Sequence, residues 1–194
     1  MKCMDCHTSL ASNTYHTVHS STVDCTACHT QSVVTCYNCH FETELELQTK
    51  KAHSKFKDWL FLVNRDGKVH TADFQSVKHD TATMVGMAPF YAHTIARDAR
   101  SSCSDCHGNA AVTDWFDDNV MDVVVWDSAQ SKLTHLEGVI PVPPNFASGG
   151  MRLDFVDLDQ PGGSVWSFLK SGADRIQLLF GEPLTQAQMD KIKH

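Results

Sequence analysis

Alternating apolar and polar residues in the middle and late parts of the chain predict β-strands. Residues 58–69 form an apolar run, an Asp-Gly pair and a second run, a pattern that favours a hairpin with a tight turn. Residues 120–126 are predicted to form a further strand, and residues 151–156 alternate in the way expected of another. The proline-rich stretch 141–145 is predicted to be extended and to interrupt regular structure.

Short helices are predicted elsewhere. Residues 165–170 are expected to form a helix that stops near Gly172. Thr185 and Gln188 have the spacing of a capping box, which predicts a helix through Ile192. Residues 1–57 contain no long periodic run, so we expect short helical turns joined by Ser- and Thr-rich connections.

Composition narrows the class of protein. The chain has 194 residues, of which 42% are hydrophobic and 20% charged, a balance typical of a soluble globular protein. No apolar run is long enough to span a bilayer. The net charge of −7 argues against a nucleic-acid partner, because such proteins normally carry a basic patch. The 8 cysteines and 12 histidines are the unusual counts.

All the cysteines fall in four C-x-x-C pairs, each followed directly by a histidine. This spacing is the signature of c-type haem attachment. On a turn of helix, the two thiols can each bond one vinyl group of the porphyrin, and the next imidazole can ligate the iron as the proximal ligand. Four covalent haems are therefore predicted. The expected thioether residues are Cys3, Cys6, Cys25, Cys28, Cys36, Cys39, Cys103 and Cys106, and the expected proximal ligands are His7, His29, His40 and His107.

C-x-x-C pairs have two other common uses in proteins. Zinc sites would pair the C-x-x-C units into tetrahedral thiolate centres, and a disulfide framework would link them covalently. Neither alternative explains why a histidine directly follows all four pairs. Haem attachment is the interpretation that accounts for the whole pattern.

Each iron needs a second axial ligand if the haem only passes electrons. Methionine is the common alternative to histidine and would raise the reduction potential. Histidine is over-represented here, so bis-histidine ligation is predicted at all four irons. The expected distal ligands are His16, His19, His53 and His93.

The spare histidines differ in their surroundings. His16 and His19 share one helical face, which suits two neighbouring haems better than one. His70 and His79 fall in or beside the predicted hairpin, where ordinary strand or loop side chains are expected. His135 and His194 lie in the cysteine-free part of the chain and rank lower as ligands.

The expected fold class is a haem-dominated multihaem cytochrome c of short helices and loops, with a small β-hairpin insert and a mixed, haem-free C-terminal region. The haem-binding region is 1–110, with haems 1–3 crowded in 1–57, the β-like insert in 58–90 and haem 4 in 91–110. Residues 111–194 are expected to cover haem edges or contact another subunit. Porphyrins would replace a conventional core, so residues 1–57 should be unfolded without haem.

At its four motifs the chain resembles the multihaem cytochromes c of metal-reducing and related prokaryotes. The tetrahaem count, the size, the histidine pair near the start and the long haem-poor tail are similar to the cytochromes that polymerise into extracellular filaments. That resemblance implies a homo-oligomer with stacked haems, in which one distal histidine comes from the next subunit, here His16 or His19. It implies redox proteins or extracellular acceptors as partners.

The predicted function is electron transfer rather than catalysis. A multihaem reductase with one open iron is the enzymatic alternative, and a module of a larger multihaem cytochrome is another. Haem is attached to such motifs outside the cytoplasm, so a periplasmic or extracellular location is expected. Cys3 leaves no room for a signal segment, and the chain is therefore expected to be a processed or truncated form.

Overall fold

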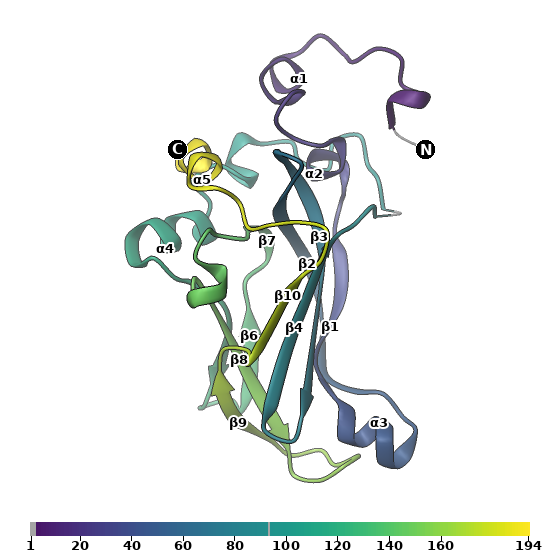
Figure 1. Ribbon diagram of the computed structural model, residues 1–194, viewed down its shortest axis with the longest axis vertical. Helices are drawn as coiled ribbons and strands as arrows, with labels where there is room; N and C mark the ends of the chain where they lie inside the picture. The colour runs from purple at the N-terminus through teal and green to yellow at the C-terminus, as the bar shows by residue number, and fades with distance from the viewer. Residues whose placement is uncertain (1–2, 93) are drawn as a thin grey trace.

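Two mixed β-sheets packed against each other form the body of the protein in a computed structural model, which describes residues 3–92 and 94–194 (Figure 1). The larger sheet has the strand order β10 (Arg175–Leu178), β4 (Ala82–Pro89), β3 (Lys68–His79), β1 (Val33–His40), β2 (Lys51–Arg65) and β7 (Gly138–Pro141). The smaller sheet has the order β6 (Lys132–His135), β5 (Met121–Asp127), β8 (Met151–Leu158) and β9 (Trp166–Ser171).

Short helices surround the sheets. They are η1 (Cys3–Asp5), α1 (Thr14–His19), α2 (Cys25–His29), α3 (Phe41–Leu47), η2 (Cys103–Asp105), α4 (Ala110–Asp118), η3 (Phe146–Ser148) and α5 (Gln186–Ile192). Figure 1 shows α1 and the N-terminal segment at one end of the sheets and α3 at the opposite end. Among the described residues, no helix has the length and apolarity needed to cross a membrane.

A conventional aromatic core lies between the two sheets. Tyr37, Trp59, Phe61, Phe74 and Phe155 are all at most 1% exposed and belong to one buried cluster. The Tyr37 ring contacts those of Trp59, Phe74 and Phe155. Full burial of one large apolar side chain is worth about 1.5–3 kcal/mol. The expectation that porphyrins replace a protein core is therefore wrong for this part of the chain.

The predicted fold class of helices and loops dominated by haem is likewise wrong, since the chain is mostly β-sheet. The hairpin at 58–69 is present, with Arg65 paired to Lys68 across the turn, but it is no small insert. Its strands lie inside the six-stranded sheet because β1 and β7 pair with β2, and β4 pairs with β3. The position of the hairpin inside the sheet depends on pairing with distant segments, which a local sequence pattern does not predict.

Of the other predicted elements, two strands and the C-terminal helix are confirmed, and one helix is wrong. The strands at 120–126 and 151–156 are confirmed as β5 and β8. The C-terminal helix is confirmed as α5, and both hydrogen bonds of the Thr185–Gln188 capping box are present. The helix predicted at 165–170 is wrong: this segment is β9, whose Trp166 and Phe168 pair with β8, and aromatic residues favour strands.

Strands from both sides of residue 110 share the larger sheet. Strand β7 pairs with β2, and β10 pairs with β4. The division into a haem-binding region 1–110 and a haem-free region 111–194 stays a prediction about where haem is held.

Candidate functional site

Three of the four C-x-x-C-H motifs form a single helical turn, as predicted. The His7 amide donates to the Cys3 carbonyl at 2.9 Å, and the His107 amide donates to the Cys103 carbonyl at 2.8 Å. The second motif is the short helix α2, which Asp24 caps by accepting a hydrogen bond from the Thr26 amide. Residues four apart on such a turn lie on the same side, so each histidine lies beside the first cysteine of its motif.

His16 on α1 faces His29 of the second motif. Their ring centres lie 6.3 Å apart, with an angle of 31° between the ring planes. The outer nitrogen of each ring is held by the backbone: Nδ1 of His16 donates to the Ala11 carbonyl at 2.9 Å, and Nδ1 of His29 donates to the Ala96 carbonyl at 3.1 Å. Because Nδ1 carries the proton in each ring, the Nε2 atom carries the lone pair that can ligate a metal.

His19, one turn further along α1, faces His107 of the fourth motif in the same way. The ring centres lie 6.1 Å apart, with an angle of 59° between the planes. Nδ1 of His19 donates to the Tyr15 carbonyl at 2.9 Å, and Nδ1 of His107 donates to the His194 carbonyl at 3.0 Å. A single helix therefore supplies one ring to each of two neighbouring motifs.

Both pairs fit a haem iron between the two rings. Imidazole–metal bonds are about 2 Å long and a ring nitrogen lies about 1 Å from its ring centre, so two rings across one metal have centres about 6 Å apart. A metal-bound histidine also typically donates its other N–H to a carbonyl or carboxylate, which fixes the ring. All four rings meet the second condition as well as the first.

Burial favours the neutral form of three thiols of these motifs. It raises the pKa of Cys25 and of Cys28, and it raises the pKa of Cys106 to about 12. Nucleophilic attack needs the thiolate, which a raised pKa disfavours. A neutral thioether carries no such cost at the same positions. All eight cysteines are free of disulfide bonds.

The third motif does not present its groups in the same way. It lies on β1 instead of a helical turn, and Asn38 within it has a left-handed φ of 55°. Cys36 is exposed, whereas His40 is 2% exposed and its Nε2 lies 3.3 Å from the Val156 carbonyl of the other sheet. The prediction of a helical turn here is wrong, and in this arrangement the residues do not fit a haem that both cysteines and His40 hold.

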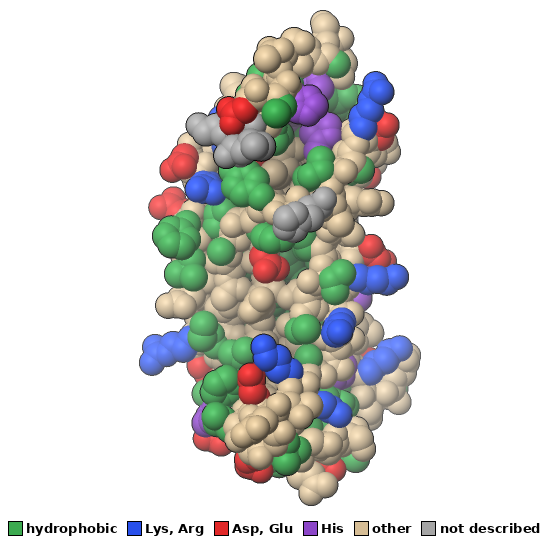
Figure 2. Space-filling model, turned by 90° about the vertical axis from the view of Figure 1, so that its right-hand side faces the viewer, with side chains coloured by type: hydrophobic (Ala, Val, Ile, Leu, Met, Phe, Trp, Pro, Cys, Tyr) green, Lys and Arg blue, Asp and Glu red, His purple; other side chains and the backbone are tan. Residues whose placement is uncertain are grey.

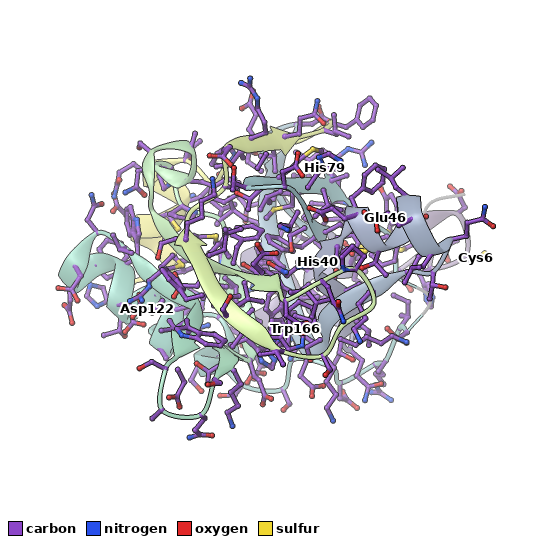
Figure 3. The ribbon with its side chains drawn as sticks, turned by 90° about the horizontal axis from the view of Figure 1, so that it is seen from below. Cys6, His40, Glu46, His79, Asp122 and Trp166 are labelled. Carbon is purple, nitrogen blue, oxygen red and sulfur yellow. The ribbon has the colours of Figure 1, made fainter. Side chains whose placement is uncertain are left out.

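His40 and His53 nevertheless lie together, because both pack edge-on against Trp166 of β9. The ring centre of Trp166 lies 5.1 Å from that of His40 and 4.9 Å from that of His53. Figure 3 labels His40 and Trp166. Burial is the main cause that lowers the pKa of each histidine. Within the part of the chain that the structure describes, the buried Nδ1 atom of His53 has no hydrogen-bond partner. Trp166 was missed from sequence because its segment was predicted as a helix.

The first motif lies on the exposed N-terminal segment. Cys3, Cys6 and His7 are exposed, and Figure 3 shows Cys6 at the edge of the molecule, far from His40. Cys3 lies close enough to Cys25 to contribute to the raised pKa of the Cys25 thiol, so the first motif adjoins the second. The expected crowding of motifs 1–3 differs from the structure, in which the fourth motif joins the first two and His40 lies toward α3.

The remaining histidines have varied surroundings, and His93 lies outside the described residues. His70 is 3% exposed, and its Nε2 lies 3.6 Å from a carboxylate oxygen of Asp24. His135 stacks on Phe56 at 4.2 Å, and His79 is exposed beside Asp80.

Comparisons with protein-family models, with curated proteins and with solved structures find nothing that matches this chain.

Proposed function

We propose that this protein is a c-type cytochrome that transfers electrons through four covalently attached haems. In this proposal the eight cysteines anchor the porphyrins, and the histidine of each motif is the proximal ligand. To hold its haem in this way, the third motif has to leave the arrangement that it has on strand β1. His16 and His19 are the distal ligands of the second and fourth haems. His53 and His93 are proposed for the third and first.

One observation carries the proposal: two pairs of histidine rings face each other at the spacing of axial ligands, and each outer nitrogen is bonded to a backbone carbonyl. Isolated surface histidines have no reason to adopt this arrangement twice. The pairs also join motif histidines to the two residues whose helical spacing suits neighbouring haems.

Bound haem supplies a one-electron couple between ferric and ferrous iron. His16 with His29, and His19 with His107, would hold the iron at the second and fourth sites and would leave no open position there for a substrate. Helix α1 holds the two sites next to each other, because His16 and His19 are one turn apart. These features favour an electron carrier over a reductase.

The partners in this proposal are redox proteins or extracellular acceptors, and the location is periplasmic or extracellular. Figure 2 shows histidine side chains gathered at one end of the face it presents, toward the end that carries α1. His16 and His19 each face a proximal ring of their own chain. We therefore propose ligation within the chain for both, and a filament of this protein would need a different intersubunit ligand.

Intact-mass measurement tests the proposal. The chain would be exported in a host that matures c-type cytochromes, purified, and weighed before and after its cysteines are blocked in a denaturant. We expect the mass of the polypeptide plus four haems, no blockable thiol, and a visible spectrum that changes on reduction with dithionite. A mass equal to the polypeptide alone, with eight free or disulfide-bonded cysteines, would refute the proposal.

A further inference from the structure

A short segment before the fourth motif fastens that motif to the second one. The Gln31 amide donates to the Thr94 carbonyl at 2.9 Å, and the Ala96 amide donates to the His29 carbonyl at 2.8 Å. Thr30 and Ile95 form an isolated antiparallel bridge between these contacts. The chain that leads into Cys103 is therefore attached to the chain that leaves His29.

Arg100 lies at the end of this segment. Its guanidinium donates to the Thr30 carbonyl at 3.2 Å and to the neighbouring Gln31 carbonyl, directly after the second motif. Its Nε is buried and has no hydrogen-bond partner among residues 3–92 and 94–194. The side chain is half-buried, so solvent screens its charge less than that of a free surface arginine.

Arg100 lies between the second and fourth motifs. Its guanidinium bonds the two carbonyls that directly follow His29, and the same side chain lines a cavity with Asp105, which lies within the fourth motif.

Carboxylates only partly surround this cation. Asp105 and Glu137 line a cavity of about 150 Å³ together with Arg100. Neither forms an ion pair with it, and within the described part of the chain Arg100 has no ion-pair partner. Its positive charge is not cancelled by direct contact.

We propose that the positive charge of Arg100 raises the reduction potentials of the second and fourth haems relative to those of the other two. This inference rests on the proposed function. A ferric haem carries one more positive charge than a ferrous haem, and a nearby cation therefore favours the reduced form. Charge and hydrogen bonding around an iron centre are established means of setting its potential. Electrons in this protein would then reside mainly at the haem pair that α1 connects.

Spectroelectrochemical titration of the holoprotein tests the inference. In Arg100→Gln we expect two of the four midpoint potentials to fall by about 59 mV each. For a one-electron couple, this shift corresponds to a tenfold change in the ratio of reduced to oxidised haem. Arg100→Lys, which keeps the charge but loses the guanidinium fork, should restore most of the difference. The matched control is Arg97→Gln, an exposed cation of the same segment, whose midpoints should stay in place.

Glu137→Gln provides a variant independent of the Arg100 contacts, and it should raise the same two midpoints by a smaller amount. Unchanged midpoints in Arg100→Gln would overturn the inference. So would equal shifts in Arg100→Lys and Arg100→Gln, which would assign the effect to packing instead of charge. If Arg100→Gln does not mature, a failure of Glu137→Gln to raise any midpoint would overturn it. Wild-type protein without covalent haem would instead remove the proposed function itself.

Discussion

Replacing His16 with alanine is expected to open the iron of the second haem, and replacing His19 is expected to open that of the fourth. Among the described residues, the His16 ring is the only aromatic ring in contact with the His29 ring, and the His19 ring is the only one in contact with the His107 ring. A six-coordinate haem has no vacant position for carbon monoxide, whereas a five-coordinate ferrous haem binds it. We expect each single variant to bind one more carbon monoxide per protein than the wild type, and the double variant to bind two more.

The optical spectrum of the reduced protein titrated with carbon monoxide measures this directly. His79→Ala is the matched control, because His79 is exposed and lies on β3 away from α1. It should bind no more carbon monoxide than the wild type. If His16→Ala and His19→Ala also bind no more, the two rings are not axial ligands and the pairing is wrong.

Preventing haem attachment is expected to unfold only the N-terminal segment and to leave the two sheets intact. In a variant with all eight cysteines changed to serine, residues 3–22 should exchange their amide hydrogens almost without protection. In the structure, this stretch is exposed except for the half-buried His16 and His19. Strand β1 should stay protected, because Tyr37 is buried in the aromatic core. Exchange with mass-spectrometric readout of peptides separates the two segments.

The sequence alone predicted that residues 1–57 as a whole would be unfolded without haem. The eight-serine variant distinguishes that prediction from unfolding of residues 3–22 alone. Slow exchange in 33–40 alongside fast exchange in 3–22 supports a protein-built core. Fast exchange in both segments would mean that the porphyrins hold β1 in place after all.

Local sequence patterns predicted the local parts of the site. The C-x-x-C-H spacing predicted helical turns at three motifs, where the bonds that close the turn lie within five residues. The H-x-x-H spacing predicted one helix face carrying both His16 and His19, as found in α1. Which proximal ring each one faces depends on the segment around Ala96 and on the C-terminal residues, and no local pattern encodes that.

The third motif shows why the same pattern can fold differently. Val33, Val34, Thr35 and Tyr37 favour a strand, and β1 completes its hydrogen bonds with residues far along the chain. Cys39 pairs with Ala52 on one side and with Val77 on the other. Sequence spacing within five residues carries no information about such partners. Arg100 was missed for the same reason, because its importance comes only from what the fold places beside it.

Electron paramagnetic resonance of the fully oxidised wild-type protein tests the central claim most directly, namely that paired histidines fill both axial positions of the iron. The account predicts low-spin ferric signals from all four haems, because it gives each iron two histidines. A high-spin ferric signal that amounts to one haem or more would contradict the account.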